Sequence, residues 1–190
     1  MKSHVHKIKE EALAISVFII SIWAVFLLDL ILPLEKFGLI PRDSDGLIGI
    51  FAMTFLHGSY QHLISNTVPL IALLTLLAGS RVDSRKIVTV IMILGGTLLW
   101  LFGRGDYSHI GASLLVFGLA VFLVVSGIIE KRTVPMIISI VVALVYGTSL
   151  LSGIMPWQNG ISWDGHLLGG IAGGITAWLL EYPWFKNIKI

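Results

Sequence analysis

Long apolar runs recur along the chain near residues 11–32, 61–79, 86–102, 112–129, 134–152 and 165–181. Most of these runs approach the roughly twenty residues that an α-helix needs to cross the hydrocarbon core of a bilayer. The connection 33–60 contains LIGIFAMTFL at 47–56, which is too short to span and fits an interfacial or re-entrant segment. The pattern therefore predicts six transmembrane helices and one short segment at the membrane surface.

The composition of the chain indicates a membrane environment. Hydrophobic residues make up 56% of the 190 residues and charged residues only 13%, which excludes an ordinary soluble domain. We expect an all-α, polytopic membrane protein that forms one domain over residues 1–190 in a lipid bilayer. Its parts are a short N-terminal tail (about 1–10), a six-helix core (about 11–181) and a short C-terminal tail. The chain has no cysteine, so disulfides and cysteine nucleophiles are excluded.

Lysine and arginine predict the orientation, because cytoplasmic loops carry an excess of them. If the N-terminus is cytoplasmic, ten of the thirteen lie inside: Lys2, Lys7, Lys9, Arg81, Arg85, Lys86, Lys131, Arg132, Lys186 and Lys189. Three lie outside: Lys36, Arg42 and Arg104. We therefore expect both termini in the cytoplasm. The chain has no basic run or motif typical of nucleic-acid binding, so we expect no nucleic-acid partner.

This topology brings four reactive side chains to one depth. The second, fourth and sixth spans run in the same direction, and their first turns hold His62 with Asn66, then Ser113, then His166. A serine nucleophile needs a base within hydrogen-bond reach, and a neutral imidazole accepts its proton near pH 7. Taken singly, Ser113 is typical of a helix cap, and His166 near the interface can be satisfied by water.

The stretch HLLGGIAGG favours close contact between the sixth span and its neighbour. Gly169, Gly170 and Gly173 follow His166 at offsets of three, four and seven, so they share its helical face. Small residues at such a spacing let two helices approach closely in a membrane. The glycines are thus either a packing motif alone or one that also brings His166 to the serine.

His62 and Asn66 are four residues apart and so lie on one face of the second span. An imidazole N–H and an amide N–H are suitable donors to a developing oxyanion, and the backbone N–H of Ser113 can add a third. The alternative for Asn66 is a hydrogen bond between helices that serves packing alone.

Other combinations of polar residues give weaker support for a catalytic or metal site. The chain has no H-E-x-x-H motif, and Asp29 is the only acid within an apolar run, so neither a zinc protease of that type nor an aspartyl protease is supported. We expect no metal and no cofactor. Asp164 could orient the imidazole as a triad acid does, but its position before the last span favours solvation. His109 and Ser108, a rival base and nucleophile, precede their helix in a region expected to be a hydrated loop.

Three motifs in order resemble those of the rhomboid family of intramembrane serine proteases. FLHGSYQHLISN resembles the family's HxxxN segment, GAS its GxSx nucleophile motif, and GHLLGGIAGG its last helix. The resemblance covers about residues 40–180.

The resemblance implies a rhomboid-like six-helix bundle of bacterial type in the plasma membrane. It implies a Ser–His dyad without an obligatory acid, here Ser113 and His166, with His62 and Asn66 supporting the oxyanion. It further implies cleavage of single-pass transmembrane proteins near their outer end, an active site near the outer face, and gating by about residues 134–164. Phe117, one turn after Ser113, is implied to pack against the histidine.

Two features depart from the family pattern. Leu114 follows the serine where many members have glycine, which we expect to tighten the site or alter substrate fit. The first outer loop has Pro41-Arg42 in place of a Trp-Arg pair, which concerns loop architecture. Two alternative functions remain open: a rhomboid-fold pseudoenzyme that binds transmembrane clients, and a carrier of protons or a small polar solute.

Overall fold

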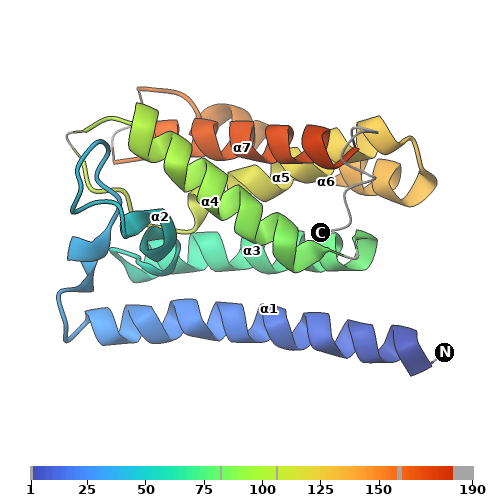
Figure 1. Ribbon diagram of the computed structural model, residues 1–190, viewed down its shortest axis with the longest axis horizontal. Coiled ribbons are helices and arrows are strands. Elements are labelled where there is room, and N and C mark those ends of the chain that lie inside the picture. Colours follow the sequence, from blue (N-terminus) through green and yellow to red (C-terminus); the bar gives the residue numbers. More distant parts are fainter. Residues whose placement is uncertain (1, 82, 106, 158–159, 182–190) are drawn as a thin grey trace.

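The computed structural model describes residues 2–81, 83–105, 107–157 and 160–181, with side chains from Lys9 onward and as far as Leu180. Figure 1 shows a bundle of helices with no strand in the described part of the chain. The elements in order are α1 (Lys2–Asp29), η1 (Leu34–Phe37), α2 (Gly49–Ala52), η2 (Met53–Phe55), α3 (Tyr60–Ser80), α4 (Ser84–Phe102), α5 (Ser113–Glu130), α6 (Thr133–Gly153) and α7 (Trp163–Glu181).

All six predicted long helices are present, and five are long and apolar enough to cross a membrane. These five comprise Lys9–Asp29 of α1 and the whole of α3, α4, α5 and α6. The sixth, α7, is not among them, because Asp164, His166 and its glycines lower its mean hydropathy. The protein is therefore an integral membrane protein with five candidate spans in its described residues, and the predicted count of six is not confirmed.

The first predicted run differs from the helix that the structure contains. It was expected over 11–32, whereas α1 begins at Lys2 and ends at Asp29. The carboxylate of Asp29, the last residue of α1, accepts hydrogen bonds from the amides of Leu34 (2.7 Å) and Glu35 (3.2 Å), and so ties the start of η1 to the end of α1. The short segment expected at 47–56 contains α2 and η2.

Helix α5 is the centre of the bundle and contacts α3, α4, α6 and α7, with the most extensive contact to α7. A Cβ atom at Gly169 or Gly173 would lie only 2.2 or 2.0 Å from a carbonyl oxygen of α5. Those oxygens belong to Leu114 and Gly118. Because helices in lipid associate mainly through van der Waals packing, this close approach holds α7 against α5. The predicted packing role of the glycines is confirmed.

Helix α1 lies apart from this centre. Figure 1 shows it running along α3, on the side away from α5 and α7. It contacts α3 and the short helices of the first loop, and Glu11 near its N-terminal end accepts a hydrogen bond from the Ser84 hydroxyl of α4 (2.6 Å). The site described below is consequently built by α3 to α7 and their loops.

Backbone hydrogen bonds tie the first loop to the segment that precedes Ser113. Leu39 and His109 exchange both of their amide–carbonyl bonds (2.9 and 2.8 Å), and the Gly111 amide donates to the Met53 carbonyl (2.8 Å). Arg42 adds bonds from its guanidinium to the carbonyls of Leu101 (3.2 Å) and Gly103 (2.7 Å) at the end of α4. Arg42 therefore anchors the loop whose sequence departs from the family pattern.

Candidate active site

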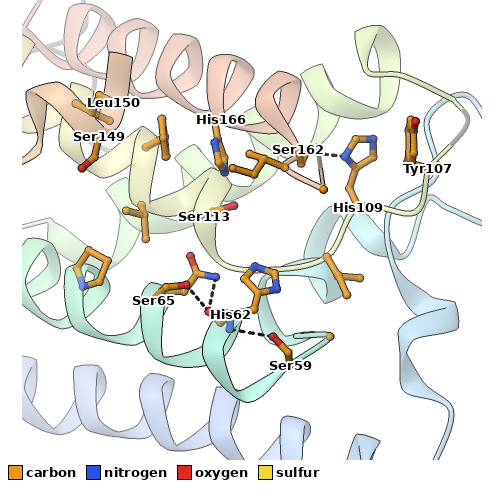
Figure 2. A pocket seen from close by; sticks show the side chains of 18 of the residues that line it. Ser59, His62, Ser65, Tyr107, His109, Ser113, Ser149, Leu150, Ser162 and His166 are labelled. Carbon is orange, nitrogen blue, oxygen red and sulfur yellow. Dashed lines mark hydrogen bonds between the residues drawn. The ribbon is translucent and has the colours of Figure 1, made fainter. Parts of the chain in front are cut away.

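A cavity of about 810 Å³ lies among the first turns of α3, α5 and α7. Its lining includes His62, Asn66, Ser113 and His166, which the sequence analysis placed at one depth. Figure 2 shows Ser113 and His166 facing this space from two different helices, with His62 approaching from α3. The predicted meeting of these four residues is confirmed, while their chemical roles stay a prediction.

The His166 imidazole is held in one tautomer. Its Nδ1 lies 2.9 Å from the carbonyl oxygen of Gly153, the last residue of α6. A carbonyl oxygen only accepts hydrogen bonds, so Nδ1 carries the proton and Nε2 keeps a free lone pair. A base that takes a proton from a serine needs this lone pair.

Phe117 fixes the plane of the same ring. The Phe117 and His166 rings stack with centroids 4.1 Å apart and planes 12° apart, which confirms the contact that the family resemblance implies. Gly153 makes room for the pair: a Cβ atom there would lie 2.4 Å from Phe117 Cζ and 3.1 Å from His166 Nδ1. The imidazole is thus held by a hydrogen bond at its edge and by a ring on its face.

We expect Phe117→Leu to lower kcat by about tenfold, because the smaller side chain lets the imidazole leave the plane in which it meets Ser113. Phe122→Leu, on the same helix but fully buried in the core, is the matched control and should lower the melting temperature without changing kcat per folded molecule. The measurement is turnover and thermal unfolding of both variants. If Phe117→Leu and Phe122→Leu lower kcat equally, Phe117 contributes to packing alone.

Ser113 is the first residue of α5, and its side chain is partly exposed to the cavity. The N-cap is Ala112, which offers no side-chain cap, so the interpretation of Ser113 as a capping residue is wrong. Within the described residues no hydrogen bond joins Ser113 to His166; in free enzymes such bonds are often long and tighten when the substrate binds. The Ser113 amide, in the first turn, has no carbonyl one turn earlier in its helix to bond.

His62 and Asn66 lie against the segment that leads to the serine. A Cβ atom at Gly111 would fall 2.5 Å from His62 Nε2 and 3.5 Å from Asn66 Nδ2. Gly111 has φ +112°, a region that side-chain-bearing residues avoid, so glycine is required here both for conformation and for space. Asn66 donates one hydrogen bond to the His62 carbonyl (3.2 Å) inside α3, and its second N–H remains for the cavity.

His57, which the sequence pattern did not single out, also belongs to the surroundings of the serine. Its buried ring accepts the amide hydrogen of Ala112 at Nε2 (3.4 Å), directly before the serine, and its centroid lies 4.9 Å from that of His62. Burial, followed by the proximity of His62, lowers the pKa of His57 to about 4. The ring is therefore neutral at pH 7, as an acceptor must be. The signal in the sequence was a histidine next to the HxxxN segment.

No hydrogen bond joins Asp164 to His166 within the described residues. Its carboxylate accepts the backbone amide of Arg104 (2.8 Å) and the guanidinium of the same residue (3.1 Å), and only 4% of Asp164 is exposed. The expectation that Asp164 is solvated is wrong, and the group that orients His166 is the Gly153 carbonyl instead. His109 is also buried, contrary to the hydrated loop expected for it, whereas Ser108 is exposed.

Leu114 points away from the cavity. It is 3% exposed and packs beside Gly95 of α4 and Ala172 of α7; a Cβ atom at Gly95 would lie 2.7 Å from Leu114 Cδ2. Its side chain fills space that Gly95 leaves open beside α4, and the expected effect of Leu114 on the site or on substrate fit stays a prediction.

Known proteins that are similar to this chain comprise one domain family and several bacterial relatives. The family model described as Rhomboid domain matches residues 44–183. An uncharacterized protein of Mycobacterium tuberculosis is 41% identical over 162 residues, which cover 79% of this chain and 66% of the relative. An uncharacterized protein of Mycobacterium leprae is 39% identical over 163 residues, covering 81% of this chain and 64% of the relative. The chain thus aligns with about two thirds of the length of these bacterial relatives.

Proposed function

Since the chain belongs to the rhomboid family, we propose that it is an intramembrane serine protease that hydrolyses peptide bonds in or near transmembrane segments of single-pass membrane proteins. The observation that carries this proposal is the state of His166: its Nδ1 is bonded to Gly153, and its Nε2 faces the cavity that also contains Ser113. A nucleophile and an oriented base in one cavity are what acyl transfer requires.

The proposed reaction uses the four cavity residues in two stages. Ser113 Oγ attacks the substrate carbonyl while His166 Nε2 takes the hydroxyl proton, and the oxyanion that forms is stabilised by the Ser113 amide, His62 and Asn66. His166 then gives the proton to the leaving amine as the C–N bond breaks. Water, deprotonated by the same imidazole, hydrolyses the acyl ester and restores Ser113.

The shape of the cavity favours proteolysis over transport. All of its lining residues fall within 58–69, 104–120 and 146–166, so they come from the half of the bundle that contains the first turns of α3, α5 and α7. A carrier of protons or polar solutes needs a path to the opposite end, and none of the described lining residues provides one.

The test is the purified protein in proteoliposomes with a single-pass model substrate, analysed by mass spectrometry. We expect a defined cut near the outer end of the substrate helix, labelling of the protein by a fluorophosphonate probe, and no inhibition by a chelator. A pseudoenzyme that binds clients would retain the substrate without cutting it and without reacting with the probe.

We further propose that both termini are cytoplasmic and that the cavity opens near the outer face. The chain has no native cysteine, so single cysteines report topology directly. A cysteine at Trp157, which is 73% exposed between α6 and α7, should react with a thiol reagent that cannot cross the membrane. One at Thr133, at the start of α6, should react only after permeabilisation. The opposite pattern would place the cavity on the cytoplasmic side.

A further inference from the structure

A second polar cluster, formed by Arg104, His109, Ser162 and Asp164, borders the cavity without including either member of the proposed dyad. Asp164 is bonded twice to Arg104, once through the backbone amide (2.8 Å) and once through the guanidinium (3.1 Å). The guanidinium also donates to the Ile161 carbonyl (3.3 Å) and lies 5.1 Å over the Trp163 ring. We call Arg104, His109, Ser162 and Asp164 together the Asp164 clamp.

His109 links two other members of the clamp, because it bonds both Arg104 and Ser162. Its Nε2 lies 3.2 Å from the Arg104 carbonyl and therefore donates a hydrogen, which leaves Nδ1 to accept the Ser162 hydroxyl at 2.7 Å. Burial lowers the pKa of His109, while the Asp164 carboxylate nearby opposes this, and the neutral ring fits both bonds. Figure 2 shows the His109–Ser162 bond beside the cavity.

The clamp joins the two segments that carry the proposed nucleophile and base. Arg104 and His109 belong to the loop between α4 and α5, and His109 precedes Ser113 by four residues. Ser162 and Asp164 belong to the start of α7, and Asp164 precedes His166 by two residues. Glycine packing fixes the bodies of α5 and α7, whereas the clamp connects the backbone just before each reactive side chain.

Within the described residues Asp164 has no hydrogen bond to Ser113 or His166, so its hydrogen bonds reach them through its neighbours. Arg104, His109 and Ser162 line the cavity, but Asp164 is not part of the lining and is 4% exposed. We infer that Asp164 is a positioning residue, which through Arg104, Ser162 and His109 sets the separation of Ser113 and His166; this inference rests on the proposed function. Charge-assisted hydrogen bonds in a buried setting are suited to hold such a separation.

The test compares Asp164→Asn with the wild-type protein in the cleavage assay. The amide keeps the shape of the side chain and one acceptor but loses the charge, so the clamp loosens without a large void. We expect kcat to fall by about 10- to 100-fold, because a displacement of about 1 Å between reacting groups costs that much. KM should stay within about twofold of wild type, since no group that faces the substrate is altered. Fluorophosphonate labelling of Ser113 should slow in parallel.

The matched control is Glu130→Gln. Glu130 forms ion pairs with Arg81 and Arg132 at the end of the bundle opposite the cavity, so this substitution also removes a charge from a structural pair. It should change thermal stability and leave kcat per folded molecule as in the wild type. Loss of kcat in both variants, in step with the folded fraction, would overturn the positioning role.

A second variant keeps the inference testable if Asp164→Asn folds poorly. Ser162→Ala removes only the hydroxyl that links His109 to the start of α7, and it should lower kcat about fivefold, the effect of one neutral hydrogen bond. Wild-type kcat in either folded variant would overturn the inference and leave the proposed function intact. An inactive, unlabelled wild-type protein would instead overturn the proposed function, and this inference with it.

Discussion

Ser113→Ala and His166→Ala are each expected to abolish cleavage of the model substrate and labelling by the fluorophosphonate probe. Either change removes one half of a nucleophile–base pair that acts as a unit, so the two losses should be equally complete and no larger when the changes are combined. Both variants should fold. Ser113 is partly exposed to the cavity, and alanine at position 166 sacrifices only the contacts of the imidazole to Gly153 and Phe117.

Ser108→Ala is the matched control for this experiment. Ser108 also lines the cavity, but it lies in the loop before α5, its hydroxyl adjoins Gly38, and its residue is exposed. Removal of the Ser108 hydroxyl should leave the rate of substrate cleavage unchanged. Cleavage by the purified Ser113→Ala variant, or inhibition of the wild-type protein by a chelator that zinc reverses, would contradict the proposed dyad.

The second large effect is expected at His62 and Asn66. Their N–H groups are proposed to bind charge that develops only in the transition state, so alanine at either position should lower kcat more than it raises KM. Loss of one oxyanion donor in serine hydrolases costs about 10²–10³ in kcat, roughly 3–4 kcal/mol. The Ser113 amide and the remaining side chain should reduce that loss, so slow cleavage and slow labelling of Ser113 remain detectable.

Gln61→Ala tests whether this loss is specific. Gln61 lies in the same turn of α3 but is exposed and outside the cavity lining, so its removal should leave single-turnover cleavage at the wild-type rate. If His62→Ala and Asn66→Ala also cleave at the wild-type rate, these two residues serve packing, and the oxyanion is stabilised by other donors.

Sequence reasoning predicted the architecture well because membrane helices must satisfy their own backbone hydrogen bonds and therefore leave long apolar runs. The run over 165–181 shows the limit of this signal. The structure contains the corresponding helix, α7. Its mean hydropathy is low because His166, proposed as the base, and the glycines that pack against α5 are all weakly hydrophobic or polar. A helix that carries a functional site is thus harder to recognise as a membrane span from composition.

The predictions that the structure contradicts concern residues whose surroundings are formed by distant parts of the chain. Asp164 and His109 looked hydrated because they lie between apolar runs, yet the structure buries both by folding the α4–α5 loop onto the start of α7. The side chain of Leu114, which directly follows Ser113, likewise occupies space beside Gly95, nineteen positions earlier in the sequence. Local pattern contains no information on such pairings.

The sequence by itself determined that the chain is a membrane-embedded helical bundle, and it determined which serine, histidines and asparagine meet at one end. Alternating helix direction predicts their common depth, because the first turns of every second span lie at the same end, and the close approach of α7 to α5 at Gly169 and Gly173 then brings His166 near Ser113. Only the tertiary structure decided that a backbone carbonyl orients the imidazole and that a second histidine bonds the segment before the serine. The Gly153 carbonyl and the His57 nitrogen reach their partners through close packing between helices and loops, and such contacts leave no periodic pattern in the chain.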